Sequence, residues 1–269
     1  MAKTNGIISI SGTIGDLTFA NRDGNPYLRE KHKGPIKQTE ATKRTAAEFK
    51  IVVKLTSRLY KLLIFFVKNY GKPAVRFRLQ TLLQHVYKSI PAIPGDHKQL
   101  MKGNIKLLEG LRFNEQLAVN SLLYQLPFIS IDREKGVRVK FETCEINSMF
   151  KTVNKAKLAA VKVQVVVLNL DDREDEMINA NPLLINLNST VFKGGTLNIP
   201  LEFVGSQLLV LCLGVHYLDE NSIIDNRKYK AAEIIYAQLL QDGQPVTYQT
   251  PAVSPKRPIV EEEGLDWEV

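Results

Sequence analysis

The amino-terminal stretch of residues 5–31, NGIISISGTIGDLTFANRDGNPYLREK, constrains the fold most, because it is patterned as strands that are too small to fold alone. Apolar side chains alternate with polar ones, and the run Arg22-Asp23-Gly24-Asn25 is typical of a hairpin turn. A ribbon of this size buries too little apolar surface to be stable by itself. Residues 1–33 therefore predict a β-ribbon that packs on the rest of the chain or on another subunit. The apolar positions expected at a subunit contact are Ile8, Ile10, Leu17, Phe19 and Tyr27.

The same stretch carries a family motif. The run from Gly12 to Phe19, GTIGDLTF, is followed by Gly24, Tyr27, Arg29 and Lys31, and then by RTAAEF at residues 44–49. Over about the first 70 residues the chain resembles a family of uncharacterised Bacteroidota proteins that open with NGII-x-x-x-GT-x-G-x-x-x-F. The resemblance implies a shared architecture and a bacterial source. It implies no catalytic activity and no site residues.

Residues 34–112 form a region in which apolar side chains recur at helical spacing. A helix over residues 39–70 is expected to separate its apolar from its basic residues, at about 100° per residue. After the break at Gly71-Lys72-Pro73, residues 74–89 predict a second helix, and a short helix is expected around residues 100–108. The expected apolar side of the first helix consists of Phe49, Val52, Leu55, Leu59, Leu62 and Phe66.

From Phe113 onward the apolar period changes from helical to two. Val137, Val139 and Phe141 alternate with charged residues, and residues 208–213 are apolar on both faces, which predicts a central strand. Several short strands without intervening helices favour a β-sandwich, immunoglobulin-like or jelly-roll-like, over residues 113–244. The expected fold class is α+β: an amino-terminal β-ribbon, a helical hairpin and an antiparallel β-sandwich. Strands are expected at residues 128–132, 137–141, 157–170, 183–187, 196–203, 208–217 and 232–240.

Residues 245–269 differ in composition from the rest of the chain. This tail is rich in proline and acidic residues, and a segment of this kind forms no core of its own. It ends with Trp267, the only tryptophan of the chain. Because tryptophan is a frequent anchor at interfaces, Trp267 joins the expected subunit contact.

Charge is distributed unevenly along the chain. Residues 1–112 contain 21 Lys or Arg against 7 Asp or Glu, whereas residues 113–269 contain 15 against 21. A basic half joined to an acidic half can bind polyanions or other copies of the chain. The candidates for binding a polyanion or an acidic partner are Lys43, Lys50, Lys54, Arg58, Lys61, Lys68, Arg76 and Arg78.

The sequence contains no pattern that indicates catalysis. The four histidines form no zinc pair, no phosphate-binding loop is present, and His216 on an apolar strand is interpreted as a core histidine. The acids of residues 171–176 lack the spacing of a calcium loop and are interpreted as a solvated turn. The chain is therefore expected to be no enzyme, with no catalytic residue, metal, cofactor or small-molecule substrate. The longest uncharged run, residues 203–218, is too short to span a membrane, so a cytoplasmic location is expected.

Two functions remain. The first is a structural subunit of a cytoplasmic bacterial filament, tube or phage-like particle, in which the ribbon adds to a neighbouring subunit and the charge asymmetry holds copies together. The alternative is a nucleic-acid-binding accessory protein that uses the basic helix side. Self-assembly accounts for more of the features and is the function that the sequence favours.

Overall fold

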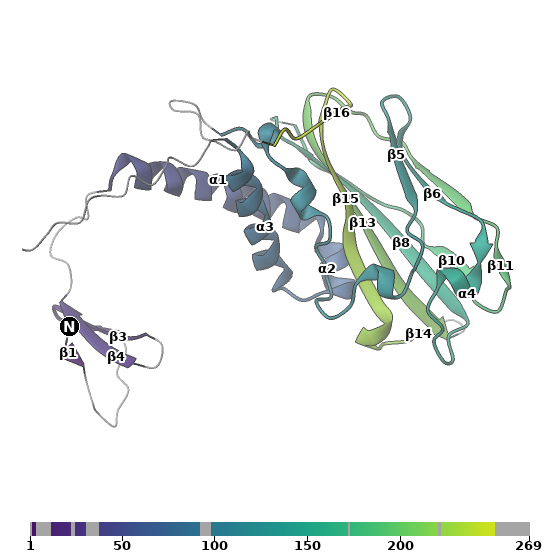
Figure 1. Cartoon of the computed structure of the whole chain (residues 1–269), viewed down its shortest axis with the longest axis horizontal. Coiled ribbons are helices and arrows are strands. Elements are labelled where there is room, and N and C mark those ends of the chain that lie inside the picture. Colours follow the sequence, from purple (N-terminus) through teal and green to yellow (C-terminus); the bar gives the residue numbers. More distant parts are fainter. Residues whose placement is uncertain are drawn as a thin grey trace, which may run out of the picture. The chain divides into compact units, whose positions relative to one another are not determined.

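The computed structural model describes residues 2–3, 12–22, 25–30, 38–91, 98–171, 173–219 and 222–250. The chain divides into two compact units, Met1–Ala47 and Glu48–Val269 (Figure 1). The long helix α1 begins in the first unit and ends in the second.

The amino-terminal unit contains an antiparallel sheet with the strand order β1-β4-β3-β2. This sheet confirms the predicted β-ribbon. Ile8 and Ile10 lie outside the described residues. The strands are β1 (Ala2–Lys3), β2 (Gly12–Ile14), β3 (Leu17–Arg22) and β4 (Asn25–Glu30).

Three helices follow the amino-terminal sheet. The hydroxyl of Thr39 accepts a hydrogen bond from the backbone N–H of Thr42, at 3.2 Å, and so caps the start of α1. The single helix expected over residues 39–70 is interrupted at Leu63. Leu63 is not helical, although its backbone N–H still donates to the carbonyl of Leu59 and its carbonyl accepts from the N–H of Val67. The helices are α1 (Glu40–Leu62), α2 (Ile64–Tyr70) and α3 (Val75–Ser89).

The remaining helical segments are short. The helix expected around residues 100–108 consists instead of two 3-10 turns, and Gly103 separates them. The short segments are η1 (Leu100–Lys102), η2 (Ile105–Leu108), η3 (Val119–Ser121), α4 (Ile146–Met149) and η4 (Arg227–Tyr229).

Two antiparallel sheets form most of the second unit. The larger has the order β10-β8-β13-β15-β16, with β9 paired to β8 and β14 to β13, and the smaller has the order β12-β6-β5. A separate pair joins β7 and β11. The strands are β5 (Phe128–Asp132), β6 (Gly136–Phe141), β7 (Cys144–Glu145), β8 (Leu158–Asn169), β9 (Glu176–Asn179), β10 (Leu183–Asn186), β11 (Val191–Phe192), β12 (Gly195–Ile199), β13 (Ser206–Asp219), β14 (Ser222–Ile223), β15 (Lys230–Gln241) and β16 (Gln244–Val246).

The large sheet is covered on both faces, which explains why its central strands are apolar throughout. Alternate residues of β8 and β13, such as Val166 and Val210, pack in one cluster with α1, α2 and α3. The intervening residues, such as Val165 and Leu211, pack in a second cluster with β6 and β12 of the small sheet. The helices and the small sheet thus lie on opposite sides of the large sheet (Figure 1). The predicted α+β fold with an antiparallel sandwich is confirmed, and β13 is central, as its sequence indicates.

The helical region and the sandwich share a core. Leu59, Phe66, Leu79 and Leu83 of the helices are fully buried against the large sheet. Each segment alone would expose this apolar surface, so we expect neither to fold independently. None of the described helices is both long and apolar enough to cross a membrane.

Candidate interaction surfaces

The strand register assigns the two sides of the amino-terminal sheet, because residues paired across antiparallel strands project to the same side. Leu17 pairs with Ile14 on one neighbouring strand, and Phe19 pairs with Leu28 on the other. Leu17 and Phe19 are two positions apart on β3 and share a side. One side of the sheet, here termed the apolar face, therefore carries Ile14, Leu17, Phe19 and Leu28, and Glu30, which pairs with Leu17, lies at its margin.

The apolar face is partly open to solvent. The side chains of Ile14 and Leu17 are 64% and 41% exposed, and Phe19 is half-buried. The opposite side is largely polar, and there the hydroxyls of Thr13 and Thr18 lie 3.4 Å apart. A single-layered sheet with one such face is the kind of element that is stabilised by a second layer.

The other residues expected at the subunit contact do not join the apolar face. Tyr27 pairs with Ala20 and so projects to the side opposite Leu17 and Phe19. Ile8, Ile10 and Trp267 lie outside the described residues.

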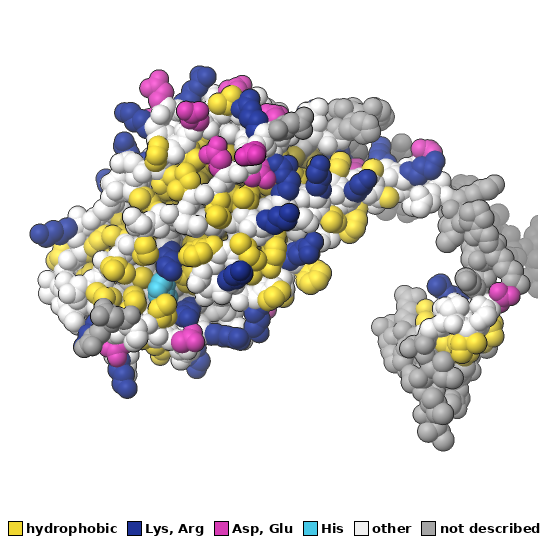
Figure 2. Space-filling view, turned by 180° about the vertical axis from the view of Figure 1, so that it is seen from behind, with side chains coloured by type: hydrophobic (Ala, Val, Ile, Leu, Met, Phe, Trp, Pro, Cys, Tyr) yellow, Lys and Arg dark blue, Asp and Glu magenta, His cyan; other side chains and the backbone are white. Residues whose placement is uncertain are grey.

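Basic side chains follow the solvent side of α1, and in Figure 2 they lie along this helix with hydrophobic side chains between them. At about 100° per residue, Lys50, Lys54 and Lys61 fall within about 40° of one another on a helical wheel. They are exposed, as is Lys68 on α2. Lys43 is also exposed and bonds to Glu40, one turn away at 2.7 Å. We call these five exposed lysines the basic stripe, and their common side of the helix is the one that the sequence predicts: Lys43, Lys50, Lys54, Lys61 and Lys68.

Arg58 does not belong to the exposed stripe. Its Nε and Nη2 donate to the carboxylate of Asp175 at 3.0 and 2.5 Å, and Nη2 also donates to the carbonyl of Asn169. On the helical wheel Arg58 lies about 80° from Lys50, toward Leu62 at the border of the buried side. This position brings the guanidinium to the end of β8. The prediction that Arg58 is a free binding residue is corrected: Arg58 joins the helical layer to the sheet.

The two arginines of α3 also have partners. Nη2 of Arg76 donates to the Ser57 hydroxyl at 3.2 Å, which joins α3 to α1. Nε of Arg78 lies 2.9 Å from a carboxylate oxygen of Glu115. Between them in sequence, Phe77 is 72% exposed. The sequence gives no signal for the exposure of this residue, because the helical period shows only that Phe77 lies off the buried side and not how open its surroundings are.

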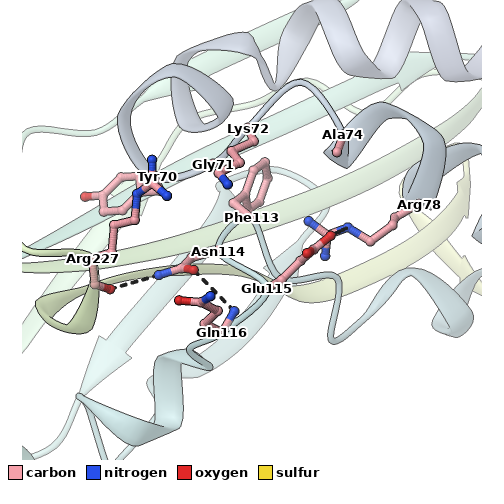
Figure 3. Close-up of a pocket in the computed structure, with 10 residues that line it drawn as sticks. All are labelled: Tyr70, Gly71, Lys72, Ala74, Arg78, Phe113, Asn114, Glu115, Gln116 and Arg227. Carbon is pink, nitrogen blue, oxygen red and sulfur yellow. Dashed lines mark hydrogen bonds and ion pairs between the residues drawn. The ribbon is translucent and has the colours of Figure 1, made fainter.

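Figure 3 shows a small hollow between the α2–α3 connection and residues 113–116. Asn114 is held in it by three bonds: its amide nitrogen donates to the carbonyls of Arg227 and Lys230, and its side-chain oxygen accepts from the N–H of Gln116. The cavity volume is about 80 Å³. This volume suits a few water molecules. The bonds of Asn114 indicate that it fastens the loop to β15.

His216 faces the helical layer and not the solvent. Its Nδ1 lies 2.9 Å from the hydroxyl of Tyr70, and both residues are buried. Burial, with the nearby charges of Lys162 and Lys230, lowers the pKa of His216 to about 4. Burial also raises the pKa of Tyr70 well above its usual range. Both groups are therefore neutral at pH 7. The pair is part of the buried core, as is expected for a histidine on an apolar strand.

Two of the described acids after β8 make structural bonds through their carboxylates. Asp175 binds Arg58, and Asp171 accepts from the backbone N–H of Ser206 at 3.0 Å. In the described part of the chain, no group of three or more His, Cys, Asp or Glu is placed to hold a metal ion. Its cysteines are free, with Cys212 buried and Cys144 half-buried.

Comparison with known proteins adds no relative: no protein-family model matches the chain, and no curated protein sequence matches it.

Proposed function

We propose that this protein is a structural subunit that assembles with copies of itself, as a filament, tube or phage-like particle, through its amino-terminal sheet. The observation that carries this proposal is the apolar face of Ile14, Leu17, Phe19 and Leu28 on a single-layered sheet, with Ile14 and Leu17 open to solvent. Exposed apolar side chains gathered on one side of a small sheet support an interaction there.

The size of the apolar face favours assembly of many copies over a tight dimer. Burying a large apolar side chain contributes about 1.5–3 kcal/mol, so four of them contribute about 6–12 kcal/mol. Association itself costs an estimated 4–15 kcal/mol. One such contact is therefore weak, and main-chain pairing at a sheet edge or simultaneous contacts in a polymer must add to it. We expect assembly to begin sharply above a threshold protein concentration.

Charge supports association between copies. Residues 1–47 contain eight Lys or Arg against four Asp or Glu, whereas residues 113–269 have an excess of acids. Opposite charges on the two regions favour contact between the amino-terminal sheet of one copy and the carboxy-terminal half of another. High salt is expected to weaken this attraction.

Electron microscopy and light scattering of the purified chain at low and high salt test the proposal. We expect ordered polymers, and we expect a chain without residues 1–33 to stay folded but monodisperse, because residues 48–269 have two buried clusters of their own. A full-length chain that stays monomeric at every concentration would contradict self-assembly.

A second function, polyanion binding by the helical layer, is favoured by one observation. Phe77, 72% exposed, follows Arg76, which bonds to Ser57 on the helix that carries the stripe, and an exposed aromatic ring can stack on a nucleic-acid base. Changing Lys50, Lys54 and Lys61 to Glu would then weaken binding to single-stranded DNA and flatten its salt dependence. Phe77→Ala would weaken binding with an unchanged salt slope. Binding that none of these changes affects would contradict this function.

A further inference from the structure

At one side of the sandwich, each of the two sheets ends in a strand whose outer edge is unpaired among the described residues. The large sheet ends at β10 and β9, the small sheet ends at β12, and no other strand among the described residues pairs with their outer edges. A free strand edge offers unpaired backbone N–H and C=O groups to an added strand. We call the region between β10 and β12 the open side of the sandwich.

A cavity of about 200 Å³ opens into the core at the open side. Val161 and Val163 of β8 and Leu183 of β10 line it from the large sheet, and Phe141 and Leu197 line it from the small sheet. A dry cavity of about 150 Å³ with this kind of lining is large enough for a benzene ring. The cavity at the open side can therefore take one large apolar side chain such as Leu or Phe.

We propose that the open side of the sandwich receives the apolar face of the amino-terminal sheet of a second copy of this chain, with Leu17 or Phe19 entering the cavity. This inference rests on the proposed self-assembly and identifies the acceptor surface for it. The occupant follows from three features of the same chain: an exposed apolar face on the amino-terminal sheet, an end strand β2 whose outer edge pairs with no strand of the described residues, and opposite charge excess in the two regions. A strand edge together with an apolar side chain in a pocket is the usual mode of strand addition.

Gly195 provides a way to close the cavity without disturbing the fold. It alternates with Leu197 and Ile199, which point into the sandwich, and a Cβ at Gly195 would meet only the ring of Phe192, at 3.9 Å. Gly195→Leu therefore places a side chain in the cavity. Asn198→Leu is the matched control, because Asn198 lies on the same strand, is exposed and does not line the cavity.

The proposal predicts different behaviour for these two full-length variants. Gly195→Leu should unfold at no lower temperature than the wild type, while its assembly, measured by light scattering, should require at least tenfold more protein. Asn198→Leu should assemble like the wild type. If the wild type assembles and Gly195→Leu assembles equally well, the open side is not the acceptor, although self-assembly itself stands. If the wild type does not assemble, both proposals are overturned.

A disulfide experiment separates docking between copies from other occupants. In a Cys144→Ser background, one preparation carries Phe19→Cys and the other Leu183→Cys, at the rim of the cavity. We expect the mixture to form linked pairs of the two chains under mild oxidation, whereas neither preparation alone links these positions. A chain with both changes that links within itself when dilute would overturn docking between copies. Native mass spectrometry that finds a copurified apolar molecule, displaced by Gly195→Leu without loss of assembly, would overturn it as well.

Discussion

The hydroxyl of Tyr70 lies 2.9 Å from Nδ1 of His216, and this hydrogen bond joins the end of α2 to the central strand of the large sheet. The contact is close on the β13 side too, because a Cβ on Gly214 would come within 2.7 Å of the Tyr70 ring. Gly214 and His216 together form the surface of β13 that contacts Tyr70. The helical layer therefore has a fixed position on the sheet that apolar packing alone does not specify.

The buried histidine makes stability depend on pH. In the folded chain the pKa of His216 is lowered to about 4, whereas an unfolded histidine has a pKa near 6.5. As the pH falls from about 6.5 toward 4, the unfolded chain binds the proton first, so the free energy of unfolding should fall by roughly 3 kcal/mol. Above pH 6.5 His216 contributes no pH dependence. Urea unfolding at pH 7.5, 5.5 and 4.5 measures this, and His216→Asn should remove that part of the slope. An equal slope in both proteins would contradict the assignment to His216.

Gly214→Ala should destabilise the chain through contact with Tyr70. The added methyl group has no space beside the ring, and overpacking of this kind costs about 1–3 kcal/mol. The cost should shrink when Tyr70 is changed to Ala, so a double-mutant cycle measured by urea unfolding isolates the contact. Additive effects of the two changes would show that the Tyr70 ring is not what excludes a side chain at position 214.

Arg58 and Lys54 lie on the same helix and are expected to differ in effect. Arg58→Met removes the charge-assisted hydrogen bonds to Asp175. It should lower the free energy of unfolding by at least the value of one such bond, about 1.5–3 kcal/mol. Lys54→Met, on the exposed stripe, should change it by less than about 0.5 kcal/mol. Thermal unfolding of both variants provides the test, and similar stabilities would show that the bonds of Arg58 are not needed to hold the helix on the sheet.

The sequence contains enough information to predict the layers. Residues 208–213 are apolar at odd and even positions alike, and a strand of this kind must be covered on both faces, as β13 is by the helices and the small sheet. The helical spacing of Val52, Leu59 and Phe66 likewise predicts the side that α1 and α2 bury. These predictions succeed because the side that an amphipathic segment buries follows its local period, although Phe49, at the same helical spacing, is 49% exposed.

The sequence does not reveal contacts between distant segments. The partner of Arg58 lies 117 positions away, and that of Tyr70 lies 146 positions away, so neither pairing has a local signal. The sequence does not distinguish Tyr27 from Leu17 and Phe19, whereas the register places Tyr27 on the other side of the sheet. The cavity at the open side also depends on where two sheets end, which residues such as Val161 and Leu197 do not indicate individually.

The two sides of β3 allow a matched test of the amino-terminal sheet in the full-length chain. Leu17 lies on the apolar face, whereas Thr18, the next residue, pairs with Thr13 on the polar side. Leu17→Asp would place an unpaired carboxylate in a dry contact, which costs several kcal/mol, about as much as one such contact is expected to contribute. Sedimentation and light scattering should therefore show that Leu17→Asp remains monomeric at concentrations where the wild type polymerises. Thr18→Asp should polymerise like the wild type. If both variants assemble normally, the apolar face is not the contact; if neither assembles, the polar side takes part as well, and a single apolar layer does not describe the interface.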